Sequence, residues 1–146
     1  MPMFVLGSLL GASPLIPSLI PAARADEEAA ETCLRTKIWD GYKDGWAVRS
    51  ATKTSLGEGE HRVYLVTLYA GNTYHVLACG DSEVANIDVV VYDSKGNKVL
   101  NDVSFDREPV VEYTPTTTDT FYVAVYASKL NAAGKQAGVA TALTYK

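Results

Sequence analysis

Two hydrophobic periods follow one another along the chain after its first 25 residues. Leu34, Ile38, Tyr42 and Trp46 recur every four residues, a spacing that favours a helix. The acidic stretch 26–31 suits the N-terminus of such a helix, because negative charge is stabilising there. We therefore predict a helix that begins near Glu27 and ends within "WDGYKDGW", where two Asp-Gly pairs favour turns.

From residue 62 onward the hydrophobic period is two, which is typical of strands. The segments are "RVYLVTL", "TYHVLAC", "IDVVVYD", "KVLNDVSF", "PVVEYTP", "TFYVAVYAS" and "AGVATALTYK". The "GN" pair at 71–72 predicts a two-residue hairpin between the first two, and "SKGN" predicts a turn after the third. With no helix between them the strands must pair antiparallel, which indicates a mainly β sandwich or barrel.

The first 25 residues differ from the rest of the chain. "MFVLGSLLGASPLIPSLI" is uncharged and mostly apolar, and "ARA" at 23–25 is a small-x-small cleavage signal, although no basic residue precedes Arg24. We expect residues 1–25 to be an export signal cut after Ala25, with a retained membrane anchor as the alternative. The division expected is then a signal peptide at 1–25, a helical and turn segment at 26–53, and a β-sandwich domain at 54–146.

Charge excludes one class of function. The chain is acidic, with a net charge of −4, and the region 81–119 holds nine acidic against three basic residues. A nucleic-acid binder presents a clustered basic surface, which is missing from this sequence, so we expect no nucleic-acid partner. No membrane span is expected after the signal is removed.

Cys33 and Cys79 are the only cysteines. In an oxidising compartment such a pair is more often a disulfide than two free thiols, so we expect them to be joined. Two separate buried thiols are the alternative. A metal site formed by both cysteines lacks further ligands at suitable spacing.

Acidic and amide side chains gather around one predicted strand. Asp81 precedes it, Asn86 and Asp88 lie in its first half, and Asp93 follows it. Calcium accepts oxygen ligands from neighbouring loops, so these four residues are a candidate Ca²⁺ site, the one cofactor considered. Alternatively, Asp93 forms the turn with Asn97, and Asp88 faces solvent on the face of the strand opposite Ile87, Val89 and Val91.

Trp39, Tyr42 and Trp46 stand beside Asp40 and Asp44. Flat aromatic faces with neighbouring carboxylates can bind sugars, so the three aromatic residues are a candidate glycan site. The favoured interpretation is that this stripe covers one face of the sandwich as part of its core.

Enzymatic signals are weak. The two histidines, His61 and His75, lie at or within predicted strands, and no G-x-S-x-G, H-E-x-x-H or C-x-x-C motif is present. A small secreted hydrolase using one of them is therefore a minor alternative, and we expect no catalytic residues.

Several segments together resemble the bacterial pre-peptidase C-terminal (PPC) domain. The matching positions are Ala70-Gly71, Tyr74 with Val76, Asn86 with Asp88, and the run 121–125, within a resemblance that covers roughly 54–145. Asn86 stands where an Asp is common in the family. The resemblance implies a jelly-roll-like sandwich of seven to eight strands, a binding or targeting role beside secreted enzymes, and calcium in some members.

These observations predict an exported, non-catalytic β-sandwich in the bacterial periplasm or outside the cell. Its expected role is binding or structural support in the cell envelope, with a protein or a polysaccharide as partner. A calcium-dependent carbohydrate-binding or adhesion module is the alternative.

Overall fold

The computed structural model describes residues 25–132 and 134–146, which form one helix and eight strands. The helix α1 spans Glu27–Lys43, and the predicted signal lies almost wholly outside the described residues. The strands are β1 (Ala47–Gly57), β2 (His61–Leu68), β3 (Tyr74–Gly80), β4 (Val84–Tyr92), β5 (Lys98–Asp102), β6 (Val110–Tyr113), β7 (Asp119–Leu130) and β8 (Gln136–Tyr145). In the described part of the chain, no helix is long and apolar enough to cross a membrane.

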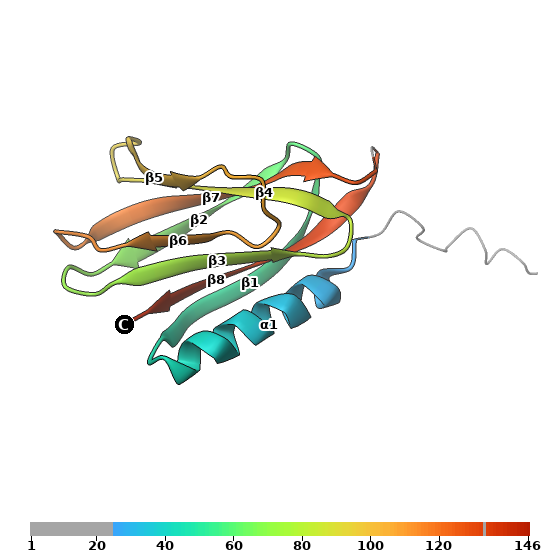
Figure 1. The fold of residues 1–146 in the computed structure, drawn as a ribbon. Coiled ribbons are helices and arrows are strands. Elements are labelled where there is room, and N and C mark those ends of the chain that lie inside the picture. The colour runs from blue at the N-terminus through green and yellow to red at the C-terminus, as the bar shows by residue number, and fades with distance from the viewer. Residues whose placement is uncertain (1–24, 133) are drawn as a thin grey trace, which may run out of the picture.

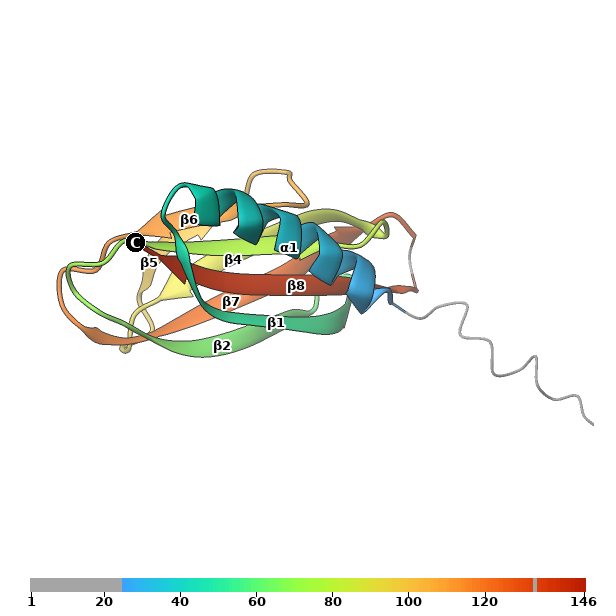
Figure 2. The ribbon, with the colours of Figure 1, turned by 90° about the horizontal axis from the view of Figure 1, so that it is seen from below.

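The strands form two four-stranded antiparallel sheets, ordered β1-β8-β3-β6 and β2-β7-β4-β5. Most consecutive strands lie in opposite sheets, the arrangement of an eight-stranded jelly roll. Figure 1 shows three layers, with α1 lying along the β1-β8-β3-β6 sheet and the second sheet on the far side. Turned by 90°, the helix runs obliquely across β8 (Figure 2). The predicted mainly β sandwich with one N-terminal helix is confirmed.

The core lies between the sheets, where alternate side chains of the strands meet. On β4, Ile87, Val89 and Val91 are fully buried, as the alternation predicted, so Asp88 and Tyr92 point to the other side of their sheet. A smaller apolar cluster lies under α1, where Ala30 and Leu34 pack on Cys79, Ala140 and other small residues of the sheet. The helix therefore covers one sheet, and among residues 25–132 and 134–146 no helix covers the outer face of the opposite sheet.

The helix begins where the acidic stretch predicted. The Asp26 side chain accepts a hydrogen bond from the Ala29 N–H at 2.9 Å, which satisfies one of the free amide donors of the first turn. Glu27 and Glu28 add favourable charge there. The helix ends at Lys43, before Gly45, whose φ of 93° suits glycine. Both Asp-Gly pairs thus lie at the end of the helix.

The predicted hairpin at Gly71-Asn72 is wrong. β2 pairs with β7, whereas β3 pairs with β8 and β6, so the connection at 69–73 carries the chain from one sheet to the other. The expected boundary between residues 53 and 54 falls inside β1, which begins at Ala47. β1 was not predicted because its exposed residues 48–53 show no apolar alternation.

The turn between β4 and β5 has the predicted chemistry. The Asp93 carboxylate accepts hydrogen bonds from the N–H groups of Asn97 and Lys95, at 2.8 and 2.9 Å. Those bonds, the Asn97 N–H first, hold the pKa of Asp93 below its usual value. Nearby, the Ser94 hydroxyl and the Thr120 N–H lower the pKa of Asp119. The folded chain therefore stabilises the ionised form of both carboxyl groups.

Acid should weaken this turn. A carboxyl whose pKa is lower in the folded state stabilises the fold at pH values above its unfolded pKa, about 3.9. The contribution is lost as the pH falls through the lower folded value. We expect Asp93→Asn to reduce the decline in the free energy of unfolding between about pH 5 and pH 2. Urea unfolding across that range measures it, with Asp40→Asn on the helix as control, and an equal decline in both variants would contradict the prediction.

Candidate functional site

The two cysteines form the predicted disulfide. Cys33 of α1 is bonded to Cys79 of β3, with the Cα atoms 5.9 Å apart. The Glu108 carboxylate lies within 4.8 Å of both sulfur atoms. Because the sulfurs are bonded to each other, they are not thiolates available to a metal ion. The disulfide therefore attaches the helix to the sheet and has a structural role.

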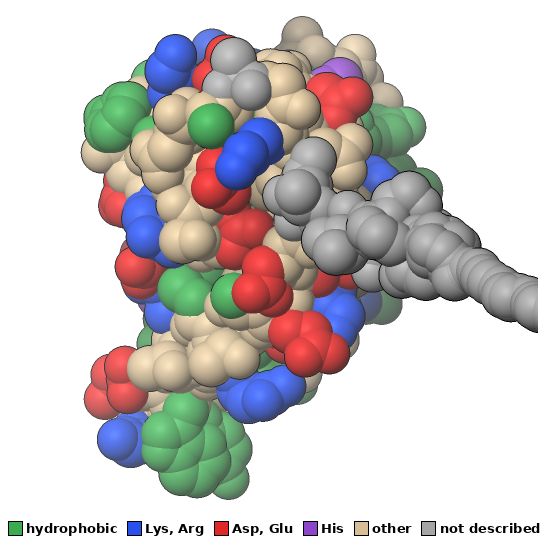
Figure 3. Space-filling view, turned by 90° about the vertical axis from the view of Figure 1, so that its right-hand side faces the viewer, with side chains coloured by type: hydrophobic (Ala, Val, Ile, Leu, Met, Phe, Trp, Pro, Cys, Tyr) green, Lys and Arg blue, Asp and Glu red, His purple; other side chains and the backbone are tan. Residues whose placement is uncertain are grey.

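Asp81, the first of the candidate calcium ligands, is buried and fully engaged by backbone donors. Its Oδ2 accepts hydrogen bonds from the N–H groups of Asp26 and Gly138, at 2.9 and 2.7 Å. Its Oδ1 accepts one from the Glu83 N–H at 2.9 Å. The Asp81 carboxylate thus joins the start of α1 to β8. Figure 3 shows this end of the molecule, where acidic and basic side chains are interspersed.

The other candidate ligands lie at separate places along β4. The Asn86 amide donates to Asp88 at 3.3 Å, Ser128 donates to the second Asp88 oxygen at 2.6 Å, and Asp93 closes the turn at the far end. In the described residues, the three acids are not among side chains grouped closely enough to share an ion. The structure brings Asn86 and Asp88 together but not Asp81 or Asp93, and calcium stays a prediction.

The aromatic residues of the candidate glycan site separate into two groups. Trp39 and Tyr42 stack on each other, with ring centroids 5.6 Å apart, and are 60% and 64% exposed. Trp46 instead stacks on His75 at 3.6 Å and lies below the Lys146 ammonium. The favoured interpretation, that this stripe belongs to the core, is therefore wrong for Trp39 and Tyr42. Trp46 already fills the space beside Gly41 in the last turn of the helix.

The two histidines stand apart and each has an aromatic neighbour. His75 Nε2 is 2.8 Å from a Glu112 carboxylate oxygen, and His61 lies against Tyr126 with ring centroids 4.8 Å apart. Within the described residues no hydrogen bond joins either ring to a serine or threonine hydroxyl. Such a bond would mark an activated nucleophile. Neither histidine stands in the arrangement that a hydrolase would use.

The outer face of the β2-β7-β4-β5 sheet is the largest feature that sequence reasoning missed. We call it the open face. It consists of the outward side chains of three strands, namely Val63, Leu65, Val90, Tyr92, Tyr122, Ala124 and Tyr126. The outer face of the other sheet is covered by α1, and here no helix of the described chain plays that role. An antiparallel sheet with one solvated face normally carries polar residues on that face.

Pairing across the strands gives the open face its shape. Val63, Ala124 and Val90 form a central row, and a row of Leu65, Tyr122 and Tyr92 lies beside it. Leu65 is 65% exposed, whereas Ala124 is 2% exposed because larger neighbours cover it. The surface of the open face is therefore depressed along the small side chains of its central row, and aromatic rings border this row.

Tyrosines hold one side of the open face in place. Tyr126 pairs with Asp88 across β7 and β4, and Tyr92 lies within hydrogen-bond reach of the Tyr126 phenol. Burial raises the pKa of Tyr126, and Tyr92 raises it further through its charge and its hydrogen bond. The Tyr126 phenol therefore stays neutral at physiological pH, and this side of the face is a surface of rings and hydroxyl groups.

The signal for this face was present in the sequence. In "RVYLVTL" and "TFYVAVYAS", the positions on both sides of each strand are apolar or aromatic, rather than on one side alone. Near-continuous apolar strands are typical of sheets covered on both faces. Since only one face of this sheet is covered by the part of the chain that the structure describes, the second apolar set was the available clue.

Comparison with known proteins gives a fold and no family. No family model and no curated protein matches the chain. Among solved structures, the chain is similar to PliG from Aeromonas hydrophila, a periplasmic inhibitor of g-type lysozyme, with a TM-score of 0.50 and 15% sequence identity. The similarity covers 68% of this chain and 88% of that one. At that identity the likeness establishes a shared β-rich fold.

Proposed function

We propose that the chain is an exported, non-catalytic binding module of the bacterial cell envelope, and that its partner is a protein held on the open face. The observation that carries the proposal is the exposure of Val63, Leu65 and Tyr122 side by side on a sheet that has no covering layer in the described chain. Contiguous apolar surface rimmed by polar groups is typical of interaction sites.

The composition of the open face favours a protein over other partners. Protein interfaces are enriched in tyrosine and depleted of charge at their centre, and their strongest contacts are aromatic side chains in packed positions. Tyr92, Tyr122 and Tyr126 surround small aliphatic residues here, and the charged Asp88 lies at one end of the face. A partner would place apolar side chains over Ala124 and Val90 and pair its polar groups with the phenols.

The fold similarity supports the choice of a first partner. PliG is a periplasmic protein that inhibits g-type lysozyme, so it is itself an envelope protein with a protein partner. We propose a bacteriolytic enzyme of the lysozyme class as the partner to test first. The acidic character of this chain, with a net charge of −4, would favour association with a basic partner surface.

Two features support export. A disulfide persists in oxidising compartments, and Cys33–Cys79 is one. The Asp26 N–H donates to the buried Asp81 carboxylate at 2.9 Å. Cleavage after Ala25 would convert that N–H into an α-ammonium group facing a carboxylate, a pairing that mature export products can use. We propose that the mature chain begins at Asp26.

Leu65→Asp is expected to weaken binding of a g-type lysozyme by about 30-fold or more, because it places a charge within the exposed apolar surface of the interface. The measurement is calorimetric titration together with the rate of cell-wall lysis. Stability should change little, since Leu65 is largely exposed. The matched control is Trp39→Asp, which changes an equally exposed hydrophobic residue on the opposite layer and should leave binding intact.

Two results would contradict the proposal in different ways. Unchanged lysis by g-type lysozyme at micromolar concentrations of the wild-type chain would exclude that enzyme as the partner. Binding that survives Leu65→Asp but is lost in Trp39→Asp would move the interface from the open face to the helix.

The exposed pair Trp39 and Tyr42 favours one second candidate, binding of a polysaccharide. Their rings are nearly coplanar, with an interplanar angle of 11°, and both are open to solvent beside Asp40. Flat aromatic surfaces of this kind can stack on sugar rings. Co-sedimentation of the Trp39→Asp variant with peptidoglycan distinguishes this role, because only a glycan platform predicts its loss.

A further inference from the structure

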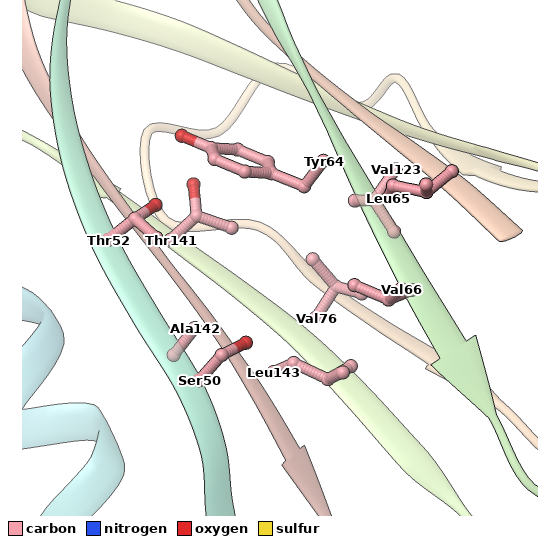
Figure 4. Close-up of a pocket in the computed structure, with 10 residues that line it drawn as sticks. All are labelled: Ser50, Thr52, Tyr64, Leu65, Val66, Val76, Val123, Thr141, Ala142 and Leu143. Atoms are coloured by element: carbon pink, nitrogen blue, oxygen red, sulfur yellow. The ribbon is translucent and has the colours of Figure 1, made fainter. Parts of the chain in front are cut away.

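A cavity of about 210 Å³ lies between the two sheets at the edge formed by β1 and β2. Val66, Val76, Val123 and Leu143 give it apolar walls, and no charged side chain lines it. Figure 4 shows the ring of Tyr64 reaching from β2 over the cavity toward β1. The cavity lies between the sheets, and Leu65 of the open face also contributes to its lining at the β2 edge.

Two arginines connect the edge strands at the ends of the cavity. Arg62 of β2 donates to the Thr54 hydroxyl of β1 at 2.8 Å, and Arg49 of β1 donates to the Thr67 carbonyl of β2 at 3.0 Å. Between these bridges, β1 and β2 are the edges of different sheets and share no hydrogen-bonded ladder. The opening is therefore fixed in length by the two bridges.

The sequence of β1 explains why the space is unfilled. Ser50, Thr52 and Thr54 lie on the inner side of β1, paired with Leu143, Thr141 and Val139 of β8. Ser50 and Thr52 are exposed at the opening, and Thr54 is buried. The short hydroxyl side chains of β1 cannot reach the β2 side of the core, as leucine or phenylalanine would. A packed interior normally leaves few voids larger than a water molecule.

One polar atom in this cavity lacks a partner. Thr141 is 8% exposed and its Oγ1 makes no hydrogen bond, although Thr54, equally buried on the neighbouring strand, accepts one from Arg62. In Figure 4 the Thr141 hydroxyl points into the cavity toward the Tyr64 ring. A buried hydroxyl without a partner is unfavourable, and such groups are rare in folded proteins.

We propose that this cavity is a binding site for a small neutral molecule with one apolar ring or a short alkyl group and one hydrogen-bonding oxygen. An apolar cavity of about 150 Å³ can hold benzene, so the present space suits a substituted ring. No charged side chain is among the described lining residues, which favours a neutral ligand, since a buried charge needs a partner. The ligand oxygen would hydrogen-bond to Thr141.

The test uses 4-ethylphenol and ethylbenzene as probes, titrated into the full chain and followed by amide NMR shifts. Both probes should shift amides of β1, β2 and β8 around the cavity. The phenol should bind about fivefold more tightly, the value of one net hydrogen bond. Thr141→Val keeps the shape and removes the hydroxyl, so it should make the two affinities equal. Thr67→Val, on the outer side of β2, is the matched control and should retain the preference.

A second variant keeps the test decisive. Thr52→Leu extends a side chain into the opening and should lower the affinity for both probes, with folding verified by a thermal melt. The proposal is overturned if neither probe shifts these amides at millimolar concentration, if the shifts map to the open face, or if Thr141→Val retains the preference for the phenol.

Discussion

Removing the Cys33–Cys79 disulfide is expected to lower the free energy of unfolding by about 4 kcal/mol. The bond closes a loop of 46 residues, and the chain-entropy model gives this magnitude for a loop of that length. The loop includes most of α1, all of β1 and β2, and most of β3, so its loss frees a large part of the unfolded chain. Urea unfolding of the Cys33→Ala/Cys79→Ala double variant measures the effect.

The helix should respond first. The apolar cluster beneath α1 is limited, with Ala30 and Leu34 as its buried helix side chains, packed on Leu77, Cys79, Ala140 and Ala142. Such a contact buries little apolar area, so the disulfide supplies much of the attachment. Amide exchange in 30–43 should therefore accelerate more than exchange in β4 and β7. A double variant within about 1 kcal/mol of the wild type would show that packing alone holds the helix.

Periodicity was sufficient to predict most of the fold. Strong alternation predicted β2 to β8, and the four-residue spacing with acidic residues at its start predicted α1. These signals are local, because each strand or helix must present one apolar side to the core. The turn at Asp93 was also predictable, since its carboxylate bonds to neighbouring N–H groups.

What failed depends on contacts between distant residues. The Gly71-Asn72 pair has the chemistry of a hairpin, yet sheet membership is decided by β7 and β8, more than 40 residues away. β1 has no hydrophobic face because it lies at the sheet edge and its inner residues line a cavity. Tyr42 follows the helical spacing, but it lies at the surface, stacked on Trp39.

In the candidate site, too, local features could be predicted from the sequence and contacts between distant residues could not. The sequence predicted the disulfide, and it identified Asp81 as a residue to examine, although as a calcium ligand. Its bonds to Asp26 and Gly138 could not be inferred, because these partners are 55 and 57 residues away. The open face and the β1–β2 cavity likewise depend on which strands pair, and this pairing is not encoded in any one segment.

Asp81→Asn is expected to lower the free energy of unfolding by about 3 kcal/mol, because removing one charged partner leaves buried donors unsatisfied. The carboxylate accepts from three backbone N–H groups, whereas an amide turns its NH₂ toward some of them. The site is closely packed, since a Cβ at Gly138 would collide with the Asp26 carbonyl oxygen. Urea unfolding gives the value.

The matched control for Asp81→Asn is Asp102→Asn. Asp102, the last residue of β5, also accepts a backbone N–H, that of Ser104, at 3.0 Å, but at an exposed site where water can replace the lost bond. The control should lower the free energy of unfolding by less than about 1 kcal/mol. Equal losses in the two variants would mean that the burial of Asp81 adds nothing to the free energy of unfolding. A larger loss at Asp81 would instead identify this carboxylate as the group that fixes the start of α1 on β8, and with it the position from which the proposed mature chain begins.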